Sequence, residues 1–338
     1  MSPLRFDEIT GRYGSLKVVL LGDFCLDRYL EIDPARAETS IETGLTVHNV
    51  VRVRSQPGGA GTILNNLVAL GVGTLHAVGF CGDDGEGYEL RRALKSLPGV
   101  HMDHFRTATD RRTFTYCKPL LMHGKGPEEL NRLDSKNWDA TPAGLEDQWI
   151  ASLRLLAADA DAVIALDQVD HADTGVVTRR VRLALGEIAQ RHPRMLVLGD
   201  SRQGLNGWPS IGYKMNAAEL AALLGQKAPP ALDDIQAQAR ELARRNGRPV
   251  IVTLSERGVV GALPDGTLEH VPALPVRGPI DIVGAGDSVT ANLTAALGAG
   301  ATLREALELA MAAANIVVHQ LGTTGSASVA QLRERLGC

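Results

Sequence analysis

The sequence predicts an α/β fold: a doubly wound, mostly parallel sheet with helices on both faces and a small β lid. Short apolar runs, typical of strands buried on both faces, alternate along the chain with segments of helical period. Residues 28–57 and 111–134 instead mix β-branched and polar residues without a helical period, which predicts a small, mainly antiparallel sheet standing off the main body. We expect one domain over residues 1–338, with these two stretches as its lid.

The individual elements follow from the same patterns. The first buried strand is predicted at 17–22, where an apolar run ends at Gly22-Asp23, and further strands are predicted at 75–79, 162–166, 195–199 and 250–254. Helices are predicted at 85–97, 144–158, 173–190 and 232–246. Capping pairs, Thr302 with Glu305 and Ser328 with Gln331, predict two further helices near the C-terminus, the second ending at Gly337.

Composition excludes several classes of protein. The chain has 338 residues, of which 44% are hydrophobic, and its net charge of -4 offers no attraction to nucleic acid or to an anionic membrane. No apolar run is long enough to span a bilayer and the N-terminus lacks the order of a signal peptide, so we expect a cytoplasmic protein. The four cysteines are widely spaced and are interpreted as packing residues rather than a disulfide framework or zinc site.

The segment 281–288, Asp-Ile-Val-Gly-Ala-Gly-Asp-Ser, is the strongest candidate for chemistry. Gly284, Ala285 and Gly286 can aim successive backbone N–H groups at one point, and the helix predicted after them adds its positive N-terminal end. Asp287 is then an acid inside a site built for anions, as expected if it faces a hydroxyl that attacks phosphorus. The alternative is a plain turn followed by a first-turn acid.

This segment resembles the C-terminal signature of the ribokinase, or PfkB-type, carbohydrate kinases. Further segments resemble motifs of that family in the same order: Gly22-Asp23 with Asp27, 57–60, 79–87, Asn216 with Glu219, and 252–258. Within the family, the D-glycero-D-manno-heptose-7-phosphate kinases are the most similar branch. They share segments like those at 22–29 (GDFCLDRY), 132–134 and 321–323.

The resemblance implies a ribokinase-like fold and ATP-dependent phosphoryl transfer to a hydroxyl of a sugar or sugar phosphate. Asp287 with the backbone of Gly284, Ala285 and Gly286 would be catalytic. The substrate-binding residues implied are Asp27, Gly58, Gly59, Asn66 and Arg132. The nucleotide-binding residues implied are Asn216, Glu219, Thr253, Ser255 and Gly258.

The same resemblance implies ATP and Mg²⁺ as cofactors, with Mg²⁺ reached through water from Asn216 and Glu219, and K⁺ as a further ion at Asp281. The chain departs from the family pattern at several positions. Ile282 stands where the signature has Thr, Thr62 and Ile63 stand where an Asn is usual, and Met311 stands at a position near the nucleotide base.

The same motifs also allow interpretations other than kinase chemistry. By spacing alone, Asn216 and Glu219 form an ordinary helix cap closed by Gly225, and Gly58-Gly59 is an ordinary turn. A dinucleotide-dependent oxidoreductase is disfavoured because 17–27 contains no GxGxxG, and a P-loop NTPase because GxxxxGK[ST] does not occur. A non-catalytic relative that binds a sugar or nucleotide remains open.

We expect a small sugar or sugar phosphate as partner, and neither nucleic acid nor membrane. Five cations are candidates for an acceptor's phosphate: Arg112, Lys118, Arg132, Arg202 and Lys214. Unpaired strand edges and apolar positions at Val47, Val50, Val51 and Val53 predict a homodimer through the lid.

Overall fold

The computed structural model describes residues 1–124, 126–228 and 230–338. Its larger sheet contains β1 (Lys17–Gly22), β6 (Thr74–Gly82), β7 (Val100–His101), β8 (Phe105–Ala108), β12 (Ala162–Asp167), β13 (Leu196–Ser201), β14 (Gly212–Asn216), β15 (Val250–Thr253), β16 (Val259–Ala262) and β17 (Leu268–Val271). The strand order is β17-β16-β15-β14-β13-β12-β1-β6-β7, with β8 also paired to β6. All neighbours are parallel except the antiparallel pairs β15/β16 and β16/β17.

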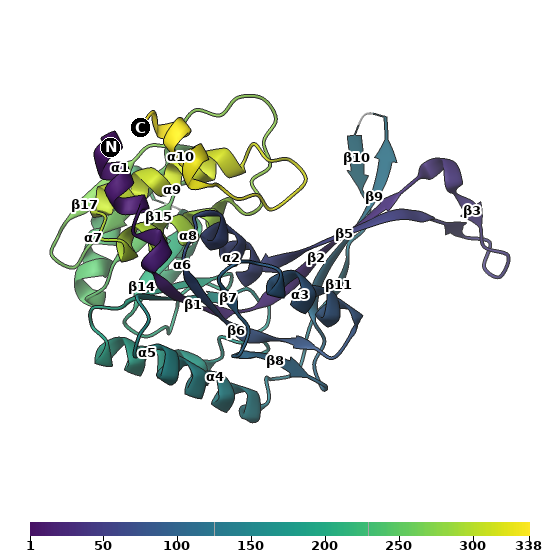
Figure 1. Ribbon diagram of the computed structural model, residues 1–338, viewed down its shortest axis with the longest axis horizontal. Coiled ribbons are helices and arrows are strands. Elements are labelled where there is room, and N and C mark those ends of the chain that lie inside the picture. Colours follow the sequence, from purple (N-terminus) through teal and green to yellow (C-terminus); the bar gives the residue numbers. More distant parts are fainter. Residues whose placement is uncertain (125, 229) are drawn as a thin grey trace.

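Helices cover both faces of this sheet (Figure 1). They are α1 (Pro3–Thr10), α2 (Ala60–Ala69), α3 (Gly85–Lys95), α4 (Ala143–Leu156), α5 (Arg179–Arg191), α6 (Ala217–Leu223), α7 (Leu232–Asn246), α8 (Ala285–Gly298), α9 (Leu303–Val317) and α10 (Val329–Leu336). Successive residues of β1 enter opposite cores: Leu20 packs in the core that holds α2, α8 and α9, and Leu21 in the core that holds α4, α5 and α7. The predicted doubly wound α/β class is confirmed.

Most predicted elements lie where the patterns put them, and α7 matches its predicted bounds. The two capping boxes, at Thr302 and Ser328, are both formed, and Gly337 ends α10 in the left-handed conformation. The prediction for α5 was wrong at its start, because Thr178 is the N-cap and the helix begins at Arg179 rather than at 173. The antiparallel edge strands β16 and β17 were not predicted.

A second sheet extends away from the main body, to the right in Figure 1. It contains β2 (Phe24–Ile32), β5 (Val50–Gly59), β9 (Phe114–His123), β10 (Gly126–Glu129) and β11 (Leu133–Ser135), in the order β10-β9-β2-β5 with β11 paired to β9. A small hairpin of β3 (Glu38–Thr39) and β4 (Thr46–Val47) lies near its tip. The pairing is antiparallel except between β2 and β9, and the role of this sheet as a closing lid stays a prediction.

The cysteines are free thiols, and Cys25, Cys81 and Cys117 are buried, as expected of packing residues. Within the described ranges, no helix combines the length and the apolar character that crossing a bilayer requires.

Candidate functional site

The segment that begins α8 forms a backbone cradle. Gly284 is the N-cap residue and has φ of 82°, a left-handed conformation that favours glycine. The Ala285 N–H donates to the Ile282 carbonyl at 3.2 Å, so this amide is already used within the turn. Gly286 and Asp287 lie in the first turn, where backbone N–H groups have no acceptor within the helix. These two amides, with the positive helix end, can receive an anion.

Asp287 lies in the same first turn and is only partly exposed. Burial raises the pKa of its carboxyl group to about 7, an effect that Lys214 opposes and that Asp200 and Asp27 reinforce. A base whose pKa lies near neutrality combines a useful ionised fraction with useful proton affinity. A pKa of about 7 therefore suits Asp287 for accepting a proton from a hydroxyl.

Asp200 was missed as a site residue by the reasoning from motifs, and Lys214 was named only as one of five candidate cations for an acceptor's phosphate. Lys214 on β14 is buried, and its Nζ lies 2.7 Å from the Asp200 Oδ2 at the end of β13. The Thr290 hydroxyl of α8 donates to the same Asp200 oxygen at 3.2 Å. One signal was available: Asp200 follows an apolar strand run, as Asp23 does, and polar residues at such strand ends meet at one edge of a parallel sheet.

Asp27 and the glycine pair Gly58-Gly59 are brought together by the pairing of β2 with β5, in which Asp27 lies opposite Gln56. A Cβ on Gly58 would lie 2.7 Å from the Asp27 Oδ2, so any larger residue at this position would displace the Asp27 carboxylate. Gly59 has φ of 57°, and its Cβ would lie 2.5 Å from the Asp23 carbonyl oxygen. The backbone of β5 thus lies close to Asp27 and Asp23, which accounts for the absence of a side chain at Gly58 and Gly59.

Asp27 is 5% exposed, and burial raises the pKa of its carboxyl group while Lys118 and Arg132 oppose the rise. Strand register places Tyr116 beside Asp27 on β9. The Arg132 guanidinium lies over the Tyr116 ring, 5.0 Å from its centroid, and the Lys118 ammonium lies 5.2 Å from the Tyr29 ring centroid. One face of the second sheet therefore gathers the Asp27 carboxyl group, aromatic rings and cations.

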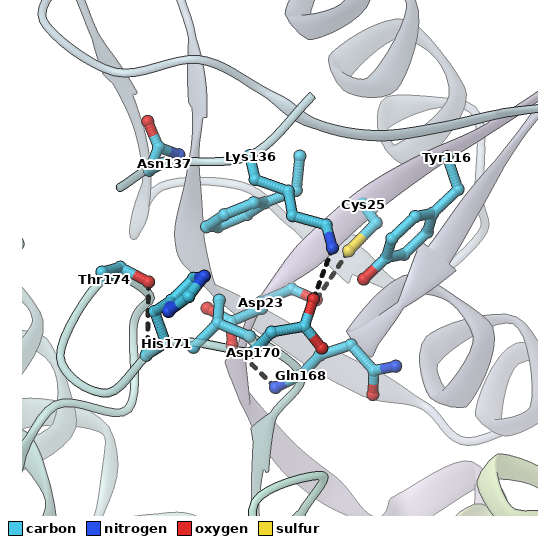
Figure 2. A pocket seen from close by; sticks show the side chains of 11 residues that line it. Asp23, Cys25, Tyr116, Lys136, Asn137, Gln168, Asp170, His171 and Thr174 are labelled. Atoms are coloured by element: carbon cyan, nitrogen blue, oxygen red, sulfur yellow. Dashed lines mark hydrogen bonds and ion pairs between the residues drawn. The ribbon is translucent and has the colours of Figure 1, made fainter. Parts of the chain in front are cut away.

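Asp23, the other acid of the first-strand motif, forms hydrogen bonds with backbone N–H groups. Its carboxylate accepts the N–H groups of Gln168 at 2.8 Å and Val176 at 2.7 Å, which fixes the loop after β12. Figure 2 shows Asp23 among the residues that line a pocket, together with Lys136 and Asp170, whose Nζ and Oδ2 atoms are 2.5 Å apart. Of the two motif acids, Asp27 is the one that lies beside Tyr116 on the second sheet, and its contact with a sugar stays a prediction.

Asn66 on α2 is fully buried, and its amide donates to the carbonyls of Thr62 at 3.0 Å and Gly325 at 3.2 Å. In this arrangement it ties α2 to the loop before α10. Its implied contact with sugar remains a prediction.

The residues expected to bind nucleotide lie at the ends of β14 and β15, where Asn216 pairs with Thr253. Asn216 and Glu219 do form the capping box of α6 that their spacing favours. The Glu219 Oε2 accepts the Asn216 N–H at 2.7 Å, which leaves its Oε1 outside that cap. Ser255 has φ of 53°, and a Cβ on Gly258 would lie 2.0 Å from the Val271 carbonyl oxygen. The tight turn after β15 thus requires Gly258.

In the described part of the chain, no group of three or more His, Cys, Asp or Glu side chains is placed to hold a metal ion. The Mg²⁺ reached through water from Asn216 and Glu219 stays a prediction. The Asp281 Oδ1 accepts the Val283 N–H at 3.0 Å, and Ile282 is 73% exposed. The K⁺ site at Asp281 stays a prediction.

Solved structures share this fold. Ribokinase from Arabidopsis thaliana, complexed with ribose and ATP, matches with a TM-score of 0.70 at 18% identity, covering 96% of this chain and 99% of that one. Phosphofructokinase-2 from Escherichia coli, in complex with substrates and products, matches with a TM-score of 0.71 at 18% identity, covering 95% and 98%. At these identities the likeness establishes the fold.

Sequence comparison establishes the family. The bifunctional protein HldE of Azorhizobium caulinodans is 30% identical over 308 residues, which are 90% of this chain and 61% of that protein. The chain thus spans about three-fifths of that relative's length. The family model described as pfkB family carbohydrate kinase matches residues 17–330. The chain therefore belongs to the pfkB family of carbohydrate kinases.

Proposed function

We propose that the chain transfers the γ-phosphoryl group of ATP to a hydroxyl of a heptose-type sugar phosphate. The observation that carries the proposal is the position of Asp287, in the first turn of α8, with its pKa raised to about 7 and within electrostatic reach of Asp27. This electrostatic interaction supports a single site shared by the proposed base and the residue expected to bind the sugar. The heptose acceptor follows from the resemblance of 22–29, 132–134 and 321–323 to heptose-phosphate kinases.

The proposed reaction moves one proton and one phosphoryl group. Asp287 accepts the proton of the attacking hydroxyl as the new O–P bond forms and the bond from the γ-phosphorus to ADP breaks. The amides of Gly286 and Asp287, at the positive end of α8, stabilise the negative charge spread over the phosphoryl oxygens. Asp27 binds hydroxyl groups of the sugar and fixes its orientation.

Asn216 and Glu219 fit an outer role toward Mg²⁺, since carboxylate and amide oxygens are suitable partners for its bound waters. When bound, Mg²⁺ supplies charge neutralisation for the nucleotide phosphates. Asp281 is the proposed K⁺ site. Replacing K⁺ with choline in the activity assay tests whether turnover depends on K⁺.

Lys118 is the best-placed cation for a phosphate on the acceptor. Four of the five candidate cations are already paired with carboxylates, Arg112 with Asp84, Arg132 with Asp134, Arg202 with Asp170 and Lys214 with Asp200. Lys118 is half-buried, lies on the same face as Asp27, and has no carboxylate within 4.0 Å in the ranges that the structure describes. A dianion needs such a partner, because burying it alone is costly.

A screen for acceptor-dependent ADP formation tests the proposal, using ATP and Mg²⁺ with free sugars and sugar phosphates, heptose phosphates included. We expect turnover with a heptose phosphate and at least tenfold lower kcat/KM for the matching free sugar. Faster turnover of the free sugar would contradict the phosphate claim. Absence of ADP formation with every acceptor would favour a non-catalytic binding protein.

A further inference from the structure

Lys214 is a buried cation at the centre of the site, and the reaction proposed for Asp287 gives it no role. It is 7% exposed, and its Nζ lies 2.7 Å from the Asp200 Oδ2. Asp200 is held in turn by the Thr290 hydroxyl at 3.2 Å. The ammonium group is therefore held by Asp200 of β13, and the Asp200 carboxylate is held in turn by α8.

The ammonium group lies against the anion cradle. A Cβ on Gly286 would be 3.2 Å from the Lys214 Nζ, so the absence of a side chain at Gly286 gives the ammonium close access to the cradle backbone. A cation beside a helix N-terminus is repelled by the helix dipole. A bound anion would reverse that repulsion, because both the helix end and the ammonium would attract it.

The charges around Lys214 come from three elements: Asp200 on β13, Asp287 on α8 and Glu219 on α6. An ammonium group has three N–H donors. In the part of the chain that the structure describes, the Asp200 Oδ2 is the acceptor within hydrogen-bond distance of its Nζ. N–H donors of the Lys214 ammonium group therefore remain for an anion in the cradle. Once water is excluded from the site, leaving these donors without an acceptor would cost free energy.

We propose that Lys214 is a further catalytic residue: its ammonium group, held by Asp200 beside Gly286, binds an oxygen of the phosphoryl group during transfer. This rests on the proposed function. Lys214 stays protonated throughout, while Asp287 takes the proton of the hydroxyl and ADP leaves with the electrons of the broken P–O bond. Asp200 is the positioning residue that aims the ammonium group.

Nucleotide binding tests the contact without an acceptor. Calorimetry with the full chain and Mg²⁺ compares ADP with the non-hydrolysable analogue AMP-PNP, which carries a third phosphate-like group. Lys214→Met should weaken AMP-PNP binding about tenfold or more, as loss of a charged hydrogen bond implies, and change ADP binding less than threefold. Lys214→Arg should restore most of the AMP-PNP affinity, and the control Lys95→Met, at an exposed position of α3, should change neither.

Measurements of kcat distinguish a catalytic role of Lys214 from a role that only neutralises the charge of Asp200. Lys214→Met should lower kcat about 10²-fold or more with little change in KM for the sugar. Because that variant leaves the Asp200 carboxylate without its cation, the double variant Lys214→Met/Asp200→Leu replaces both charges with apolar groups and safeguards folding. If Lys214 only neutralises Asp200, the double variant recovers kcat; the proposal requires kcat to stay low.

Equal AMP-PNP affinities of wild type and Lys214→Met, or wild-type kcat in the double variant, would overturn the role of Lys214 while leaving the proposed function intact. Failure of the wild-type protein to bind either nucleotide would overturn the proposed function and this role together.

Discussion

The Gln56 side chain of β5 donates from its Nε2 to the Thr324 Oγ1 at 2.6 Å, across 268 residues of sequence. The Thr323 hydroxyl donates back to the Gln56 Oε1 at 2.9 Å. A Cβ on Gly284 would lie 3.4 Å from the Thr324 Cβ, so this loop also lies against the anion cradle. Because Gln56 is paired with Asp27 in register, it links the second sheet to the anion cradle.

Replacing Gln56 with Leu should weaken acceptor binding while sparing the chemistry. Loss of two neutral hydrogen bonds, each worth about 1 kcal/mol, should raise KM for the sugar about tenfold and leave kcat within about threefold. Steady-state kinetics measures both constants. Gln190→Leu, at an exposed position of α5, is the matched control, and an unchanged KM in the Gln56 variant would contradict the link.

Gly58→Ala should impair both stability and acceptor binding, because its Cβ would lie 2.7 Å from the Asp27 Oδ2. We expect Tm to fall by about 2–3 °C, which for a chain of this size corresponds to about 1–2 kcal/mol. KM for the acceptor should also rise. Gly85→Ala is the control, since nothing lies within 4 Å of its added Cβ; equal Tm values for the two variants would contradict the close approach.

Lys118→Met tests recognition of the acceptor's phosphate. KM for the sugar phosphate should rise about tenfold or more while KM for ATP stays constant, as loss of one charged hydrogen bond implies. The exposed Arg36→Met is the control for a general change of charge. If KM for the free sugar rises by the same factor, Lys118 does not recognise the phosphate.

The outer side of the second sheet should mediate a homodimer. Val47, Val50, Val51 and Val53 are 37–48% exposed, and β5 is an edge strand of that sheet. Exposed apolar edges of this kind favour pairing with another chain. Light scattering should give a dimer for the wild type and for the control Val276→Lys, and a monomer for Val51→Lys/Val53→Glu. A wild-type monomer at high micromolar concentration would contradict the prediction.

The sequence predicted the elements whose signals are local. The period of α7 and the capping pairs at Thr302 and Ser328 depend on neighbours within one or two turns. The start of α5 was misplaced because the loop before it is held by distant contacts, including the Val176 N–H to Asp23. Local sequence patterns cannot predict contacts with such distant partners.

The same dependence on distant partners explains which residues of the candidate site could be predicted from the sequence. The cradle at Gly284–Asp287 and the pair Asp27 with Gly58 were proposed because short motifs mark them. Lys214 was singled out only as one of five cations, since its contact with Asp200 depends on the order of β13 and β14 in the sheet. Gln56 was not singled out at all, because its partner Thr324 is 268 residues away.

Asp287 carries the central claim, and its ionisation predicts the pH dependence. Its pKa in the folded protein is about 7, above the ordinary value of 3.8, so the folded state binds this proton more tightly than the unfolded state. This contribution to stability is fully present below about pH 4 and is lost as the pH rises to about 7. Asp287→Asn does not titrate, so its Tm should exceed that of the wild type at pH 8 and approach it at pH 4, which also shows that the variant folds.

The most direct test is the pH profile of kcat/KM for the wild type beside the turnover of Asp287→Asn. We predict that wild-type kcat/KM rises with pH to a plateau with a midpoint near 7, where the base becomes ionised. Asp287→Asn should lose about 10²–10⁴-fold in kcat while binding AMP-PNP as the wild type does. A folded Asp287→Asn protein that keeps more than about half of the wild-type kcat would contradict the assignment of Asp287 as the base.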